Sequence, residues 1–137
     1  IQDENELIIK PELEQKLAEQ FAGRDLIFYT DTDEMVRRID VACKRNELNR
    51  MRGIVKYYDD VLDQHPLSVE DFEADPSRAL LYKRKFFEFQ KEFRVVIKKP
   101  FQNDLILDTG NTRDIAYNLG KVESGKIPLA MRFKPKE

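Results

Sequence analysis

Residues 86–98 carry the clearest pattern in the chain, an alternation of apolar and polar side chains with a period of two. Such alternation is typical of a strand with one face on a core and the other in solvent. The apolar positions are Phe87, Phe89, Phe93, Val95 and Ile97. The polar positions are Glu88, Gln90, Glu92, Arg94 and Lys98. The pattern therefore predicts a sheet, with an amide, a carboxylate and a guanidinium in one row on its exposed face.

The size and charge of the chain limit its class. Its 137 residues, 41% of them hydrophobic and nine of them Phe, suffice for one globular domain with a single core. Charged residues make up 36% of the chain but nearly cancel, to a net charge of -2. The overall field would therefore not attract a nucleic-acid backbone, and binding one would need a local basic patch.

Cysteine and histidine are almost absent from the sequence, with only Cys43 and His65 present. Neither an internal disulfide nor a Cys/His zinc cluster can form within one chain, so we expect a cytoplasmic protein without a metal site. The apolar runs are far too short to span a membrane, and none is expected to do so. The chain begins with Ile1 instead of Met, so we expect that sequence upstream of it is missing.

Two helices are predicted in the first half of the chain. Pro11 suits a first helical position and Gly23 suits a stop, which predicts a helix over residues 11–22. A second helix over residues 33–46 follows a run of capping residue types. Cys43 lies on the apolar face of this second helix, so we interpret it as a core residue and not as a nucleophile.

A short apolar run predicts a buried strand at residues 26–29, and a second strand is predicted at residues 54–58, after Gly53. Between the second strand and the alternating segment, Ser68 and Pro76 are each placed to start a short helical turn. His65 directly precedes a proline, which favours an extended or turn conformation. We interpret it as an exposed loop histidine without a catalytic role.

The last third of the chain predicts a strand at residues 105–107, a turn at 109–111, a helix over about 112–119 and a final alternating strand over 127–133. Pro128 favours an edge position for that final strand.

This order of elements predicts a single α+β domain over residues 1–137, with helices packed on a mixed or mostly antiparallel sheet. Residues 1–10 and 134–137 are expected to be loosely ordered.

Several patterns that could bind a ligand have simpler structural interpretations. The Gly110 turn follows a predicted strand and precedes a predicted helix, but it lacks the Lys and the glycine spacing of a phosphate loop. Two acidic clusters offer oxygen ligands to a hard cation, yet neither has the glycine and final Glu of a calcium loop. They are Asp31, Asp33 and Glu34, and Asp59, Asp60 and Asp63. We interpret the first as helix capping and also favour a structural role for the second.

The row of Gln90, Glu92 and Arg94 is the strongest candidate site. The amide could orient a substrate group, and the carboxylate could accept a proton or stabilise positive charge. A nearby guanidinium would keep Glu92 ionised, which suits an electrostatic role better than that of a general acid. The alternative is a polar strand face on which Glu92 pairs with Arg94, or across strands with Lys83 or Lys85.

Part of the chain resembles a family of uncharacterised bacterial and phage domains. The resemblance covers residues 31–119 and is strongest in the segment from Phe87 to Arg94, which follows the pattern F-x-F-Q-x-E-F-R. The motifs Leu81-Tyr82-Lys83, Gly53-x-Val55-x-Tyr57 and Leu107-x-Thr109-Gly110 also fit. The family has no agreed biochemical activity, so the resemblance implies none for this chain.

A second resemblance concerns chemistry. Gln90-Lys91-Glu92 is similar to the Gln-x-Glu strand motif of ADP-ribosyltransferases. The resemblance implies that Glu92 is catalytic, that Gln90 selects the acceptor and that NAD is the cofactor. Those enzymes also use an upstream strand with Arg or His and another with Ser or Tyr. Only Arg24 and Tyr29 lie near an early strand here, so the chain departs from that pattern.

Three functions remain open. The first, which we favour, is a non-catalytic module without a cofactor that binds another protein through an aromatic patch. The aromatic candidates are Tyr57, Tyr58, Phe86 and Phe101. The second is an ADP-ribosyltransferase-like enzyme or a degenerate relative. The third, which we do not expect, is nucleic-acid contact through a basic run. That run comprises Arg37, Arg38, Lys44, Arg45, Arg50 and Arg52.

Overall fold

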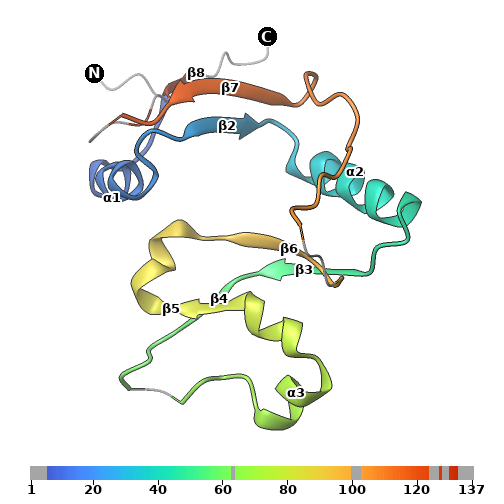
Figure 1. The fold of residues 1–137 in the computed structure, drawn as a ribbon. Helices are drawn as coiled ribbons and strands as arrows, with labels where there is room; N and C mark the ends of the chain where they lie inside the picture. The colour runs from blue at the N-terminus through green and yellow to red at the C-terminus, as the bar shows by residue number, and fades with distance from the viewer. Residues whose placement is uncertain (1–5, 63, 100–102, 124–126, 128–129, 133–137) are drawn as a thin grey trace. The chain divides into compact units, whose positions relative to one another are not determined.

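A computed structural model describes residues 6–62, 64–99, 103–123, 127 and 130–132. Contacts within the chain divide it into two compact units. The terminal unit combines residues 1–32 with 111–137, and the central unit comprises residues 33–110. Within these residues, the strands form four two-stranded sheets, three antiparallel and one parallel (Figure 1). The α+β class and the mostly antiparallel pairing are confirmed, although the strands pair two by two instead of joining one sheet.

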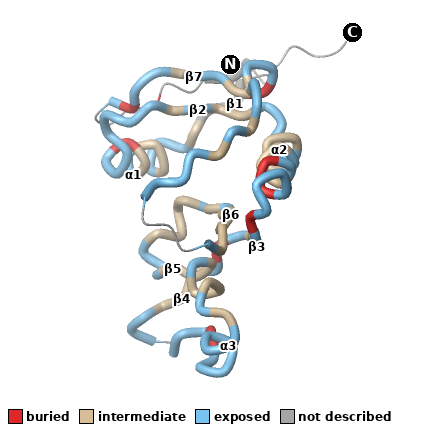
Figure 2. The backbone as a smooth tube through the Cα atoms, turned by 45° about the vertical axis from the view of Figure 1, so that its right-hand side comes forward, coloured by how far each residue is buried: buried red, intermediate tan, exposed pale blue. Residues whose placement is uncertain are grey.

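The terminal unit brings together strands from the two ends of the chain. β1 (Glu6–Ile8) pairs antiparallel with β8 (Ala130–Arg132), and β2 (Asp25–Tyr29) pairs antiparallel with β7 (Ala116–Lys121). The helix of this unit is α1 (Pro11–Phe21). Among the described residues, buried positions are few and lie at separate points along the chain (Figure 2).

The core of the terminal unit joins α1 to residues beyond β7. Ala18, Val122 and Ile127 are buried together. They are flanked by the partly buried residues Ile9, Leu17 and Leu26. The Ile127 N–H donates to Glu14 Oε1 at 2.9 Å, which ties the C-terminal segment to the helix.

The predicted helix over 11–22 is confirmed as α1. Pro11 occupies its first turn, where a missing N–H costs no helical hydrogen bond. Gly23 follows the helix with a φ of 79°, a left-handed conformation that favours glycine, and its N–H donates to the Val122 carbonyl at 2.8 Å.

The central unit begins with most of α2 (Thr32–Arg45) and contains two sheets. β3 (Arg50–Ile54) pairs antiparallel with β6 (Phe93–Ile97). β4 (Lys56–Tyr58) pairs in parallel with β5 (Tyr82–Arg84). Three short helices complete the unit: α3 (Val69–Ala74) and the 3-10 helices η1 (Pro76–Leu81) and η2 (Lys85–Gln90).

Local signals in the central unit are largely confirmed. The second predicted helix is α2, and Cys43 on its apolar face is fully buried. Ser68 caps α3 by accepting from the Asp71 N–H at 3.1 Å, and η1 begins at Pro76. The predicted strand at 54–58 is only partly correct, because β3 begins at Arg50 and the buried Val55 separates it from β4.

The prediction of a continuous strand over residues 86–98 is wrong. Lys85–Gln90 forms η2, Lys91 takes a left-handed conformation with φ 47° and ψ 51°, and only Phe93–Ile97 is strand. The pairing partner β3 has five residues, which pair with Phe93–Ile97, and no other strand of the described residues pairs with the first half of the segment. Unpaired backbone polar groups favour a local turn, whose hydrogen bonds lie within the segment itself.

Two other predictions in the last third of the chain are also wrong. Residues 105–107 form no strand, and Ile106 is 92% exposed. The helix predicted over 112–119 is a single turn, in which the Thr112 carbonyl accepts from the N–H groups of Ile115 and Ala116. The chain then extends as β7, because pairing with β2 supplies its hydrogen bonds.

The ends of the chain differ partly from expectation. Within 1–10, which we expected to be loosely ordered, Glu6–Ile8 is a paired strand. The final strand spans Ala130–Arg132 among the described residues. Pro128, Leu129, Phe133, residues 1–5 and the tail 134–137 lie outside the part of the chain that the structure describes. Within that part, no helix is long and apolar enough to cross a bilayer.

Candidate functional site

The residues of the predicted row meet in the central unit, although they do not lie on one strand. Lys83 Nζ donates to Gln90 Oε1 at 2.5 Å and also to Glu92 Oε1. Arg94 contacts Glu92 Oε2 through Nε at 2.8 Å and through Nη2 at 2.7 Å. Arg94 Nη1 also donates to the Leu80 carbonyl at 2.7 Å. The four side chains form one network, which we call the Glu92 cluster.

Three elements position the Glu92 cluster. Lys83 lies on β5, Gln90 ends η2 and Arg94 lies on β6. The left-handed Lys91 turns the backbone between Gln90 and Glu92, so that both can reach Lys83. The Glu92 N–H donates to the hydroxyl of Tyr57 on β4 at 2.9 Å, which fixes the backbone beneath the carboxylate.

The electrostatics of the Glu92 cluster oppose acid–base chemistry. Burial raises the pKa of Glu92, but hydrogen bonds from Lys83 and Arg94 outweigh it and leave the pKa below its usual value. Both carboxylate oxygens already accept hydrogen bonds from cations. The arrangement matches the alternative prediction, in which Glu92 pairs with Arg94 and across strands with Lys83. A group held in this way stabilises a fold more readily than it binds a substrate.

Other predicted candidates have structural roles. His65 is exposed in a loop, as expected; its Nδ1 accepts from the Leu67 N–H at 3.1 Å, and its ring contacts those of Tyr58 and Tyr82. In the Gly110 turn, Asp108 Oδ1 accepts from the glycine N–H at 2.8 Å, and no helix follows.

The acidic clusters do not form a cation site in the part of the chain that is described. Among those residues, no three His, Cys, Asp or Glu side chains converge as metal ligands. Asp59 accepts hydrogen bonds from the N–H groups of Val61 and Leu62, and Asp60 pairs with Arg84. Asp63 lies outside the described residues.

Four of the six residues of the predicted basic run contact two carboxylates of α2, two arginines on each. Glu34 accepts from Arg37 Nε at 2.6 Å and from Arg38 Nε at 2.8 Å, and these hydrogen bonds lower its pKa to about 2. Asp40 accepts from Arg50 Nε and from Arg52 Nη1, each at 2.5 Å. The hydrogen bond from Arg50 is the main reason why the pKa of Asp40 is lowered.

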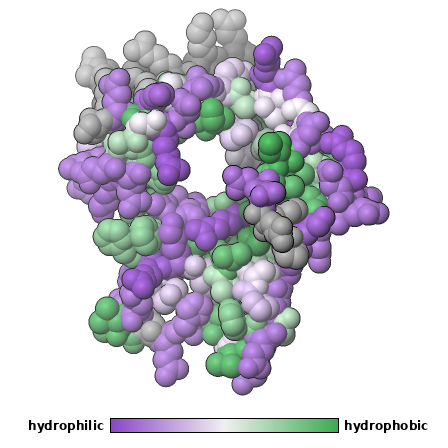
Figure 3. Space-filling view, in the orientation of Figure 1, coloured by the Kyte–Doolittle hydropathy of each residue, from purple (hydrophilic) through white to green (hydrophobic). Residues whose placement is uncertain are grey.

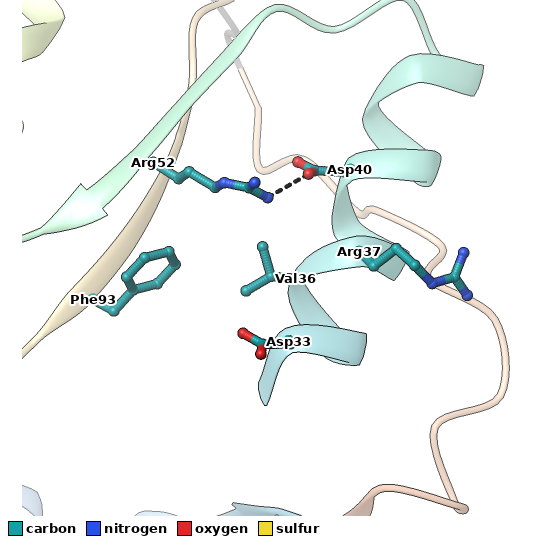
Figure 4. Close-up of a pocket in the computed structure, with 6 residues that line it drawn as sticks. All are labelled: Asp33, Val36, Arg37, Asp40, Arg52 and Phe93. Carbon is teal, nitrogen blue, oxygen red and sulfur yellow. Dashed lines mark hydrogen bonds and ion pairs between the residues drawn. The ribbon is translucent and has the colours of Figure 1, made fainter. Parts of the chain in front are cut away.

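A pocket of about 420 Å³ lies between α2 and the β3–β6 pair, a volume within the range of small-ligand sites (Figure 4). Six residues line it: Asp33, Val36, Arg37, Asp40, Arg52 and Phe93. None of the sequence patterns described above indicates this pocket. The α2 wall of the pocket could have been recognised from the sequence, because its four residues follow the spacing that places side chains on one side of a helix. They are Asp33, Val36, Arg37 and Asp40. The second wall, formed by Arg52 and Phe93, could not be recognised in this way, because it depends on which strands lie beside α2.

Comparison of the chain with protein-family models, with curated proteins and with solved structures finds no match. Its function is therefore inferred from its residues and their geometry.

Proposed function

We propose that the chain is a non-catalytic protein-interaction module. The observation that carries this proposal is an exposed apolar pair on the β3–β6 sheet, Ile54 and Phe93. The two residues are register partners and are 73% and 50% exposed. The flanking pairs, Val55 with Glu92 and Asn49 with Lys98, hydrogen-bond through their backbones, so the ladder places Ile54 and Phe93 at a closely spaced, non-hydrogen-bonded position.

Burial of such a pair would favour association. Covering a large apolar side chain contributes on the order of 1.5–3 kcal/mol, and contiguous apolar surface beside polar groups is typical of protein interfaces. The central unit exposes other large apolar residues, and the face in Figure 3 shows hydrophobic groups among hydrophilic ones. Those at least as exposed as Ile54 are Val61, Leu62, Phe86 and Ile106.

The expected aromatic patch is revised by these observations. Phe86 is exposed, but Tyr57 and Tyr58 are half-buried and Tyr57 holds the Glu92 backbone. Phe101 lies outside the described residues. The proposed contact surface is therefore the Ile54–Phe93 pair instead of the tyrosines.

The alternative functions receive less support. An ADP-ribosyltransferase-like reaction would need Glu92 to contact the ribose of NAD, but Lys83 and Arg94 occupy its carboxylate. Nucleic-acid contact would need a local basic patch, but two carboxylates of α2 pair with four of the six basic residues and cancel two of their positive charges. A cytoplasmic location and membership of the bacterial and phage domains belong to the same proposal and rest on the sequence alone.

Site-specific photo-crosslinking tests the proposal. A photoreactive benzoylphenylalanine at Ile54, in extract of the source organism, should give a discrete adduct with a second protein. The same group at Lys91, an exposed position on the η2 turn, serves as the matched control and should give none. No adduct beyond the control would contradict the proposal. So would a rise in the melting temperature with NAD that is lost in Glu92→Ala.

A further inference from the structure

The α2–β3–β6 pocket, lined by the six residues named above, has ends of different chemistry. Figure 4 shows Asp33, Val36, Phe93 and Arg52 arranged around one space, while Arg37 points away from it. Arg52 and its partner Asp40 form one end, and Asp33 forms another. An occupant would therefore meet a guanidinium, an apolar wall and a carboxylate.

The Arg52 end carries an excess of positive charge. One carboxylate, that of Asp40, lies between the guanidinium groups of Arg50 and Arg52, which leaves one charge of the three uncompensated. Within the described residues, Arg52 donates only through Nη1, and its side chain is 50% exposed. A guanidinium has five N–H donors in a plane, so Arg52 can donate hydrogen bonds to a second carboxylate without releasing Asp40.

The apolar wall lies next to this guanidinium. Val36 and Phe93 line the pocket, and Ile54 continues the surface as the cross-strand neighbour of Phe93. Arg52 is two residues before Ile54 on β3, so the two side chains point to the same face of the sheet. A carboxylate at Arg52 would thus have an apolar group beside it on Ile54 and Phe93.

We propose that this pocket binds an acidic residue of a partner protein that has an apolar neighbour, with the carboxylate on Arg52 and the apolar side chain on Ile54 and Phe93. Asp33 sets the orientation, because its negative charge repels the ligand carboxylate from the other end. This inference rests on the proposed interaction function and adds the chemistry of the partner.

Blocked dipeptides test the inference directly. N-acetyl-Glu-Phe-amide, titrated into the full chain and followed by NMR, should shift the Arg52 Nε–H and Phe93 ring signals. N-acetyl-Gln-Phe-amide should bind about fivefold more weakly, because a half-exposed charge pair contributes modestly. Equal binding of the two peptides, or tighter binding of N-acetyl-Lys-Phe-amide, would overturn the inference. Displacement of the peptide by a short single-stranded oligonucleotide at lower concentration would overturn it too.

Three variants test which residues bind the Glu-Phe peptide. Arg52→Gln should reduce Glu-Phe binding to the Gln-Phe level, whereas Arg84→Gln, a control at an exposed arginine that pairs with Asp60, should leave it unchanged. Asp33→Asn should tighten Glu-Phe binding severalfold, because it removes the repelling charge, and it tests the pocket even if Arg52→Gln does not fold. Weaker binding in Asp33→Asn, or equal losses in Arg52→Gln and Arg84→Gln, would refute the assignment.

The two proposals fail in different ways. If Ile54 gives a crosslink but the Glu-Phe and Gln-Phe peptides bind equally well, the proposal of an acidic ligand is wrong and the interaction function still stands. Absence of the crosslink would count against the interaction function itself.

Discussion

Charged side chains of the central unit are arranged around shared carboxylates. Glu34, Asp40 and Glu92 each hold two cations, and the carboxylate side chains are between 23% and 26% exposed. Partly desolvated pairs of this kind are screened less by salt than fully exposed ones. They therefore contribute to stability and to the local charge at the same time.

The Glu92 cluster allows a direct test of this stabilisation. Glu92→Gln should lower the free energy of unfolding in urea by about 1–2 kcal/mol, because Lys83 and Arg94 lose their ionised acceptor. Glu88→Gln is the matched control, since its pair with Lys91 is more exposed, and it should cost less than about 0.5 kcal/mol. Equal effects of the two substitutions would show that the Glu92 cluster adds nothing specific.

The lowered pKa of Glu34 predicts that the stability of the protein falls at acidic pH. Hydrogen bonds from Arg37 and Arg38 lower its folded pKa from 4.5 to about 2. A depressed folded pKa means that its contribution is present above pH 4.5 and is lost as the pH falls from about 4.5 to about 2. Melting temperatures across this window should therefore fall more steeply for the native chain than for Glu34→Gln. Parallel curves would contradict the prediction, and 1 M salt should narrow the difference.

Among the elements, the turn from η2 into β6 is the most constrained. Lys91 adopts a left-handed conformation, which costs a residue with a side chain about 1–2 kcal/mol and glycine almost nothing. The turn is needed because it brings Gln90 and Glu92 to Lys83. Backbone strain at this position is thus offset by the Glu92 cluster.

Substitution of Lys91 should reveal this strain. Lys91→Gly should raise the free energy of unfolding by up to about 1 kcal/mol, and Lys91→Val should lower it by about 1–2 kcal/mol, since β-branched residues tolerate this conformation least. Lys91→Ala controls for loss of the ion pair with Glu88 and should change little. Urea unfolding measures all three. A Val variant as stable as the Gly variant would exclude a left-handed residue here.

The division into two units predicts that they respond separately to damage in their cores. Val122 is 4% exposed in the terminal unit, with Ala18 and Ile127 beside it, and Val55 is 2% exposed in the central unit. Neither environment contains an ion-pair partner for a buried carboxylate among these core residues.

Val122→Asp should destabilise the terminal unit by about 3 kcal/mol or more, because it buries a charge. Hydrogen exchange read by mass spectrometry should show faster exchange in β2 and β7, while β3 and β6 keep their protection. Val55→Asp is the reciprocal variant and should expose β3 and β6 instead. Uniform loss of protection in either variant would mean that the two units unfold together.

Much of the helical structure was predictable because its signals are local. Pro11 and Gly23 bound α1, Ser68 caps α3 and Cys43 marks the buried face of α2, each within one or two turns of the residues it affects. The candidate site was predicted only in part. The pairing of Glu92 with Arg94 and Lys83 was foreseen as an alternative, whereas the pocket beside Phe93 was not.

The α+β class, the two long helices and the charge balance of the chain follow from the sequence, because helical hydrogen bonds and caps join residues close in sequence. Tertiary structure alone decided where the alternating segment stops being a strand, that β7 replaces a helix and that Arg52 and Phe93 face α2. A strand needs a partner from elsewhere in the chain, and a pocket needs walls from several elements. Neither the partner strand nor the walls of the pocket can be recognised from the residues of one segment alone.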